Sequence, residues 1–235
     1  MSQTGAPIDL SILMPAYNEE RTIERAIEEV LAVEYPVKRF ELLVVENGST
    51  DATRERLLKR EWPEPVRIIG VNPNRGKGGA VRTAIQAARG TYSVILDADL
   101  EYDASDIPSL IEPLLVGDAQ AVFGVRGFSS HTSYGFWYVM GGKAVNLAAN
   151  VLYNSWLSDI TTCMKACSTD LYRSLDLRER SFTIDAEIPA HLLRRGIRIH
   201  EVPVRYRARS REEGKKLRAS DGVRLLWTLV RCRVE

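Results

Sequence analysis

The 235-residue chain is poor in cysteine and histidine and carries almost no net charge. Its three cysteines, Cys163, Cys167 and Cys232, are odd in number and follow no framework spacing, which excludes a disulfide-stapled fold and favours reduced thiols in a cytoplasmic protein. Neither the cysteines nor the three histidines show the spacing of a zinc site. The 32 basic and 31 acidic residues leave a net charge of +1, so we expect no nucleic-acid partner.

Long apolar runs are also missing. No run approaches the roughly 20 residues that cross a bilayer, and the N-terminus lacks the charged-then-apolar pattern of a signal peptide. We therefore expect a protein that is soluble or bound peripherally at the inner face of a membrane. Because no internal repeat or low-complexity linker interrupts the chain, residues 1–235 are predicted to form a single domain.

Strands and helices alternate along the first half of the chain. Apolar runs at 10–14, 40–45, 66–71, 92–96 and 119–124 predict strands, and 197–202 predicts a late one. Helical patterns begin at Asn18 or Glu19, after the turn at 47–51, and at 80–88, 105–115, 141–153, 188–195 and 220–231. This order predicts an α/β fold with a Rossmann-like, mostly parallel central sheet and helices on both faces.

Two prolines suggest element boundaries. Pro15 is expected to end the first strand. Since proline is tolerated in the first turn of a helix but not in its interior, Pro189 predicts a helix that begins no earlier than about Glu187.

Three acidic side chains, Asp97, Asp99 and Glu101, follow the strand at 92–96. Neighbouring carboxylates disfavour each other's ionisation, and a divalent cation removes that cost. Mg²⁺ and Mn²⁺ prefer oxygen ligands and are often held by one or two carboxylates together with substrate phosphates. The stretch predicts a site for a metal and a diphosphate, the alternative being a solvated acidic loop at a helix start.

The other unusual polar motifs also follow predicted strands. They are Asn18-Glu19, Glu46-Asn47, the glycine-rich stretch 75–79, and Arg126. Ligands of such sheets bind beyond the carboxyl ends of the strands, so these motifs predict one shared site. No G-x-G-x-x-G follows the first strand and 75–79 is not a Walker A sequence, which disfavours a dinucleotide dehydrogenase and a P-loop enzyme.

The order of these motifs resembles family 2 glycosyltransferases of the GT-A fold, and more narrowly the polyprenyl-phosphate sugar synthases such as the dolichyl-phosphate mannose and glucose synthases. The resemblance spans roughly residues 8 to 230. The motifs that carry it are Leu13-Met14-Pro15-Ala16-Tyr17-Asn18-Glu19-Glu20, Val44-Val45-Glu46-Asn47-Gly48-Ser49-Thr50-Asp51, Asn74-Arg75-Gly76-Lys77-Gly78-Gly79-Ala80, Asp97-Ala98-Asp99-Leu100-Glu101, Asp159-Ile160-Thr161-Thr162-Cys163-Met164-Lys165, Phe182–Ile188, Glu201–Val204 and Arg209–Lys216.

The resemblance implies an inverting, metal-dependent hexosyltransferase that uses Mg²⁺ or Mn²⁺. It would move a hexose from a GDP- or UDP-sugar to a polyprenyl phosphate, with the nucleotide-sugar half at about 8–125 and the acceptor half at about 126–235. Two departures leave the ligands open. Glu46-Asn47 stands where the family often has paired aspartates near the base, and no transmembrane helix follows the catalytic residues.

On the donor side, the resemblance places Pro15, Tyr17 and Glu19 against the nucleotide and Glu46 and Asn47 near the base. Asp97 at its strand end is suited to a ribose hydroxyl and Lys77 to the phosphates, and Ala98 is expected to contact the sugar nucleotide. Asp99 and Glu101 would hold the metal. Two residues have equally simple structural interpretations. Glu19 suits the start of a helix electrostatically, and Asp51 is either a nucleotide ligand or a helix cap.

On the acceptor side, Arg126 is suited to hold a phosphate, with Lys143 and Lys165 as weaker candidates. Asp159 is expected to position the acceptor, with Asp185 and Glu187 as alternatives. A phosphate acceptor is already ionised and barely needs a base. Arg209, Lys215 and Lys216 are interpreted as a basic loop that closes on the phosphates, although composition alone favours a solvated loop.

The amphipathic segment 220–231, with Trp227 on its apolar side, is interpreted either as a membrane-surface helix or as a helix packed on the core or on a second subunit of a homo-oligomer. Two rival functions remain open at this stage. One is a family 2 glycosyltransferase with a soluble small-molecule or natural-product acceptor, and the other is a non-catalytic protein that binds sugar nucleotides.

Overall fold

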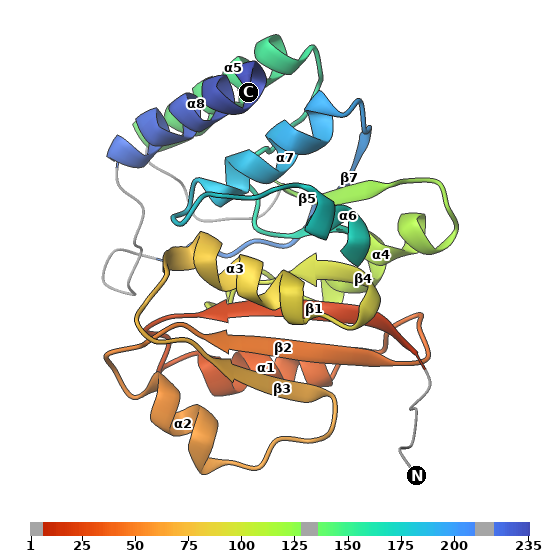
Figure 1. Cartoon of the computed structure of the whole chain (residues 1–235), viewed down its shortest axis with the longest axis vertical. Coiled ribbons are helices and arrows are strands. Elements are labelled where there is room, and N and C mark those ends of the chain that lie inside the picture. The colour runs from red at the N-terminus through yellow and green to blue at the C-terminus, as the bar shows by residue number, and fades with distance from the viewer. Residues whose placement is uncertain (1–6, 128–135, 210–218) are drawn as a thin grey trace.

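The computed structural model describes residues 7–127, 136–209 and 219–235. Within these ranges the chain forms a seven-stranded sheet with the order β3-β2-β1-β4-β6-β5-β7 (Figure 1). The strands are β1 (Ile8–Ala16), β2 (Phe40–Glu46), β3 (Val66–Gly70), β4 (Gly90–Ile95), β5 (Ala121–Arg126), β6 (Lys165–Ser168) and β7 (Ile199–Val204).

One strand of the sheet runs against the others. β1 pairs in parallel with β2 and β4, β2 with β3, and β5 with β7, whereas β6 lies antiparallel between β4 and β5. All strands except β6 therefore end at one edge of the sheet. This confirms the prediction of a mostly parallel sheet.

Helices cover both faces of the sheet. In Figure 1, α3 lies in front of β1 while α1 lies behind the sheet. The helices of the described residues are α1 (Ile23–Leu31), α2 (Thr53–Lys59), α3 (Gly76–Ala87), α4 (Ile107–Leu115), α5 (Phe136–Tyr153), α6 (Thr169–Ser174), α7 (Ile184–Arg194) and α8 (Ala219–Val234), with a short 3₁₀ turn at Ala104–Asp106.

The main core lies on both faces of the central strands. Leu10, Ile12 and Leu13 of β1 are fully buried, as are Leu42 and Leu43 of β2. Strands covered on both faces need apolar side chains at successive positions, which explains why their sequences show continuous apolar runs.

A second, smaller apolar cluster joins α5, α7 and α8. It contains Val145 and Ala149 of α5, Ala186 and Ala190 of α7, and Leu229 of α8. In Figure 1 these helices lie beyond the β5–β7 end of the sheet. Since β5, β6 and β7 belong to the same sheet as β1 to β4, the two halves of the chain share one continuous sheet.

The first strand does not end at Pro15 as the sequence suggested. β1 continues to Ala16, and Pro15 lies opposite Val45 of β2. The β1–β4 pairing has already ended at Leu13. Proline is tolerated here because β4 no longer pairs with β1 at this position, so no backbone hydrogen bond to β4 is lost with the missing N–H.

The expected start of the late helix is also wrong. α7 begins at Ile184, so Pro189 lies inside it rather than in its first turn. Tertiary contacts anchor this early start, since Asp185 and Glu187 both have partners outside the helix. Two short elements, β6 and α6, were not predicted at all. None of the described helices is long and apolar enough to span a bilayer.

Candidate active site

Five carboxylates gather at the carboxyl edge of the sheet, near the point where the chain crosses from the β1–β3 side to β4. They belong to Glu19, Asp97, Asp99, Glu101 and Asp185. Two cationic side chains, Lys77 and Arg209, contact them. Ligands of doubly wound sheets bind at this switch point.

Lys77 joins the first half of the chain to the second. Its Nζ donates to Asp97 Oδ2 at 2.8 Å and to Asp185 Oδ2 at 3.0 Å. Burial alone would favour the neutral amine, but Asp185 and Asp97 together raise the pKa of Lys77 well above its usual value. Both of these contacts are internal carboxylates, and the expected contact of Lys77 with substrate phosphates stays a prediction.

Arg209 makes the second set of ion pairs. Its Nη1 lies 2.9 Å from Glu19 Oε2, its Nη2 lies 2.8 Å from Asp99 Oδ2, and its Nε lies 3.5 Å from Glu101 Oε1. Glu19, expected either to face the nucleotide or to complement a helix start, is thus part of the acidic group.

Glu101 anchors the segment that carries Arg209. Its Oε1 accepts from the backbone N–H of Arg209 at 3.0 Å, and its Oε2 accepts from the Tyr206 hydroxyl at 2.6 Å. Its backbone carbonyl accepts from the N–H of Arg207. The sequence reasoning missed Tyr206, whose position between two arginines just after the last strand was the available signal.

Asp99 is the carboxylate most affected by its surroundings. Burial, followed by the charges of Asp97 and Glu101, raises the pKa of Asp99 to about 7. Both expected metal ligands have internal partners: Glu101 accepts from Tyr206 and from the N–H of Arg209, and Asp99 accepts from the N–H of Glu101 and from Arg209.

The donor set fits a hard divalent cation. The residues supply several carboxylate oxygens. The five acidic groups also outnumber the two cations, Lys77 and Arg209, so a bound cation would balance negative charge. The oxygens of Asp97, Asp99 and Glu101 do not form a closed three-ligand cage in the described residues. This favours one or two carboxylates plus phosphate oxygens over a cage built by protein alone.

Glu46 and Asn47 follow β2 and are both buried. The side chain of Asn47 is fully engaged: it donates to Asn74 and to the Gly76 carbonyl and accepts from the N–H of Arg75. Glu46 uses Oε1 to accept from the N–H of Ser49 at 2.6 Å. Its Oε2 is buried without a hydrogen-bond partner among the described residues.

The remaining donor-side residues lie at the same edge. Asp51 accepts from the N–H and hydroxyl of Thr53 and from the N–H of Glu20, which supports its interpretation as a local cap. Pro15 and Ala98 are buried, and Tyr17 is half-buried.

The glycines at the start of α3 contact the chain itself. A Cβ atom on Gly76 would lie 2.0 Å from the Arg180 carbonyl oxygen, and one on Gly78 would lie 2.2 Å from that of Glu179. Gly78 also donates its N–H to Arg180. At both positions the space that a side chain would need is taken by the loop before α7.

Arg126 and Asp159, both assigned to the acceptor by the sequence, are paired with each other. Arg126 Nε lies 2.6 Å from Asp159 Oδ2, and Nη2 lies 2.6 Å from Oδ1 and 2.8 Å from Thr161 Oγ1. The sequence did not show this pairing, and the expected contact of Arg126 with a phosphate stays a prediction. Nη1 has no partner among the described residues, so this face of the guanidinium remains available for an anion.

The comparisons with known proteins agree with this arrangement. A family model described as glycosyl transferase family 2 matches residues 11–175. The chain belongs to glycosyl transferase family 2.

The chain is similar to longer glycosyltransferases. It is 30% identical over 214 residues to glycosyltransferase AglD of Haloferax volcanii, covering 86% of this chain and 33% of the relative. It is 40% identical over 101 residues to the dolichyl-phosphate beta-glucosyltransferase of Drosophila melanogaster, covering 39% and 31%. The chain thus spans about a third of the length of these two relatives.

A solved structure shows the same fold. Glucosyl-3-phosphoglycerate synthase of Mycobacterium tuberculosis, crystallised with Mn²⁺, UDP and glucosyl-3-phosphoglycerate, matches with a TM-score of 0.73 at 23% identity, covering 97% of this chain and 80% of that one. The predicted GT-A fold is confirmed.

The other basic residues expected at the acceptor site differ in their surroundings. Lys143 is exposed on α5. Lys165 is fully buried, lies 5.0 Å from the centre of the Phe123 ring, and donates to the Thr162 carbonyl. Burial lowers the pKa of Lys165. Lys215 and Lys216, together with most of the expected basic loop, lie outside the described residues.

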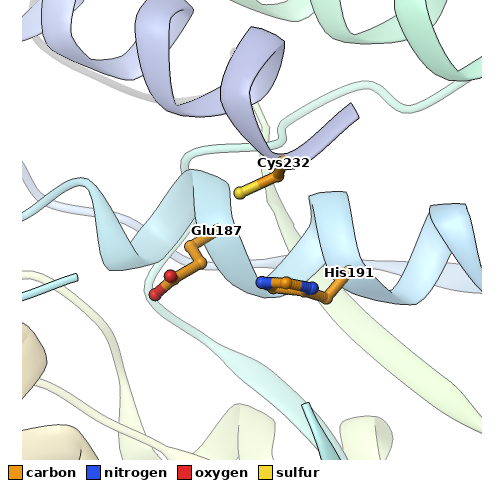
Figure 2. A group of neighbouring side chains, drawn as sticks. All are labelled: Glu187, His191 and Cys232. Carbon is orange, nitrogen blue, oxygen red and sulfur yellow. The ribbon is translucent and has the colours of Figure 1, made fainter. Parts of the chain in front are cut away.

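One further group of side chains comes from two helices, α7 and α8, and its proximity could not be predicted from spacing along the sequence. Figure 2 shows Glu187 and His191 on α7, with Cys232 reaching toward them from α8; their ligand atoms lie within 4.8 Å of one another. Glu187 accepts the N–H groups of Arg178 and Glu179, both at 2.9 Å. We therefore assign Glu187 to anchoring the loop that packs on α3, and not to the acceptor.

Proposed function

We propose that this chain is the catalytic part of an inverting, metal-dependent hexosyltransferase that transfers a hexose from a nucleoside-diphosphate sugar to a polyprenyl phosphate. The observation that carries the proposal is the group of five carboxylates with two cations at the switch point of a family 2 glycosyltransferase fold.

On the donor side, Glu46 favours a nucleotide whose base carries a ring N–H. Its buried Oε2 needs a hydrogen-bond donor, and leaving it unpaired is costly. Uracil and guanine each offer such an N–H, which matches UDP- or GDP-sugars. Asp99, with Glu101 in support, would hold Mg²⁺ or Mn²⁺. That metal, when bound, supplies Lewis-acid stabilisation to the departing diphosphate.

On the acceptor side, Arg126 favours an acceptor that carries a phosphate. Asp159 holds the guanidinium through Nε and Nη2 and leaves Nη1 to bind an anion. Burial opposes ionisation of Asp159, but the hydrogen bond and charge of Arg126 lower its pKa, so Asp159 stays ionised and holds no proton for transfer. An acceptor phosphate needs no strong base, which suits this role for Asp159 as a positioning residue.

A lipid acceptor is supported by an exposed apolar surface on α5 and α8. The two helices are joined by bonds from the Tyr153 hydroxyl to the Leu229 carbonyl and from Arg233 to the Leu152 carbonyl. The exposed apolar side chains of these helices are Met140, Leu147 and Val151 of α5 and Val223, Trp227, Val230 and Val234 of α8, and exposed Trp156 follows α5. The same helices carry exposed Lys143, Arg224 and Arg233. This pairing of apolar and basic side chains fits peripheral contact with an anionic bilayer.

The test is a transfer assay. Purified protein with Mn²⁺ is given UDP- and GDP-hexoses together with a short polyprenyl phosphate, the matching polyprenol, or 3-phosphoglycerate. We expect product with the polyprenyl phosphate and little with the alcohol. Transfer to 3-phosphoglycerate in preference to the lipid would favour the soluble-acceptor function. Nucleotide binding without turnover on any acceptor would favour a non-catalytic sugar-nucleotide-binding protein.

A further inference from the structure

Arg209 lies between the carboxylates that a divalent cation would need. Its guanidinium contacts Asp99 at 2.8 Å and Glu19 at 2.9 Å and lies 3.5 Å from Glu101. One positive charge therefore faces three carboxylates. All four side chains are less than one-fifth exposed, so water screens these charges only weakly.

The guanidinium is only partly satisfied in this position. Its Nε is buried and has no hydrogen-bond acceptor among the described residues. Lys77, by contrast, makes two hydrogen bonds to its two carboxylates. A guanidinium presents a rigid fork of donors that matches phosphate oxygens, so a diphosphate would satisfy Arg209 better than this carboxylate group does.

We propose that Arg209 competes with the divalent cation for Asp99 and its neighbouring carboxylates, so that the cation binds tightly only together with a nucleoside diphosphate. Two cations in one small carboxylate group repel each other, which weakens binding of the metal alone. A diphosphate removes the conflict by supplying oxygens both to the metal and to Arg209. The role of the diphosphate rests on the proposed function, whereas the competition for carboxylates does not.

The experiment measures Mn²⁺ binding by the paramagnetic resonance signal of the free ion at pH 7.5. It is done first without nucleotide and then with saturating UDP or GDP. The proteins are the wild type, Arg209→Gln, Arg209→Lys and the matched control Arg207→Gln. Arg207 is exposed on the same segment and has no side-chain contact with the carboxylate group in the described residues.

We expect Arg209→Gln to bind Mn²⁺ alone at least tenfold more tightly than the wild type. Arg209→Lys, which keeps the charge, and Arg207→Gln should bind it like the wild type. The factor by which UDP or GDP tightens Mn²⁺ binding should shrink at least tenfold in Arg209→Gln.

Unchanged or weaker binding of Mn²⁺ alone by folded Arg209→Gln overturns the inference. If Arg209 only clamps its segment, the variant will lose thermal stability without gaining Mn²⁺ affinity, which also overturns it. Failure of the proposed function looks different: neither UDP nor GDP would alter Mn²⁺ binding in any variant, while the nucleotide-free measurement would still decide the competition.

Discussion

Arg126 and Asp159 form a two-pronged ion pair between the end of β5 and the segment that leads into β6. Both contacts measure 2.6 Å, and the N–H of Arg126 also donates to Asp159 at 3.3 Å. The pair ties the backbone and the side chain of Arg126 to one carboxylate. The position of this guanidinium therefore depends on the charge of Asp159.

Low pH should lower the free energy of unfolding, because protonation of Asp159 breaks this ion pair. The folded-state pKa of Asp159 is lowered, so its stabilisation is present above the usual carboxyl pKa of about 4 and is lost as the pH falls through the lowered value. Asp159→Asn should therefore cost about 1–3 kcal/mol at pH 7 and progressively less toward pH 3. Urea unfolding at several pH values measures this. Glu29→Gln, at the exposed Arg25–Glu29 pair, is the control and should change stability by less than about 1 kcal/mol. A pH-independent loss in Asp159→Asn would contradict the assignment.

Asp99→Asn should separate activity from stability. Because the folded-state pKa of Asp99 is raised to about 7, its contribution to stability is present at low pH and is lost as the pH rises through 7. The variant should lose Mn²⁺-dependent turnover, yet in EDTA at pH 8 its melting temperature should equal or exceed that of the wild type. Near-normal turnover would remove Asp99 from the metal site.

Glu46→Gln should weaken nucleotide binding by roughly tenfold to a hundredfold, since the buried acceptor Oε2 would be replaced by an amide donor. Titration calorimetry with UDP, GDP and CDP in the presence of Mn²⁺ measures this. The wild type should prefer UDP or GDP over CDP, whose base lacks the ring N–H, and the variant should lose that preference. Equal binding of CDP by the wild type would exclude the role of Glu46 in base recognition.

Gly78→Ala should lower the free energy of unfolding by about 1–3 kcal/mol, because its Cβ would lie 2.2 Å from the Glu179 carbonyl oxygen. Gly141→Ala is the matched control. Gly141 lies in α5 with nothing within 4 Å of its Cβ position, so alanine there should stabilise the helix by about 0.5–1 kcal/mol. Chemical denaturation compares the two variants, and similar changes in both would refute the close contact.

Trp227→Ala should reduce binding to vesicles that contain anionic lipid, since Trp227 is 68% exposed on the apolar surface of α5 and α8. Leu58→Ala removes a similarly exposed apolar side chain from α2, at the opposite end of the molecule in Figure 1, and should bind like the wild type. Co-sedimentation at low salt measures both. If the wild type does not bind such vesicles, or instead forms a dimer through this surface, the membrane role is excluded.

The sequence predicted the parallel strands because most of them are rich in apolar residues and are bounded by turn residues. It missed β6, whose four residues begin with Lys165 and pair with strands distant along the chain. The element boundaries predicted from Pro15 and Pro189 were wrong for a related reason. Whether a proline is tolerated depends on which partner would have accepted its missing N–H, and that partner is set by the tertiary fold.

The candidate site was predicted as a set of residues but not as a set of pairs. Asp97, Asp99 and Glu101 were identifiable because they are neighbours along the chain at a strand end. The contacts of Lys77 with Asp185 and of Arg209 with Asp99 join segments more than one hundred residues apart. Sequence motifs show which charged residues are present. Which of them pair depends on tertiary packing, and no local sequence pattern predicts that packing.

The antiparallel β6 has a consequence for how the chain is made. β4 and β5 are synthesised first, but they do not pair with each other, and the strand that joins them comes from residues 165–168. Until that segment leaves the ribosome, both strands keep an open edge, the feature by which nascent sheets recruit foreign strands. The sheet is therefore completed late in translation. A chain released before β6 would leave one edge of β4 unpaired and both edges of β5 unpaired, because β7 is synthesised later still.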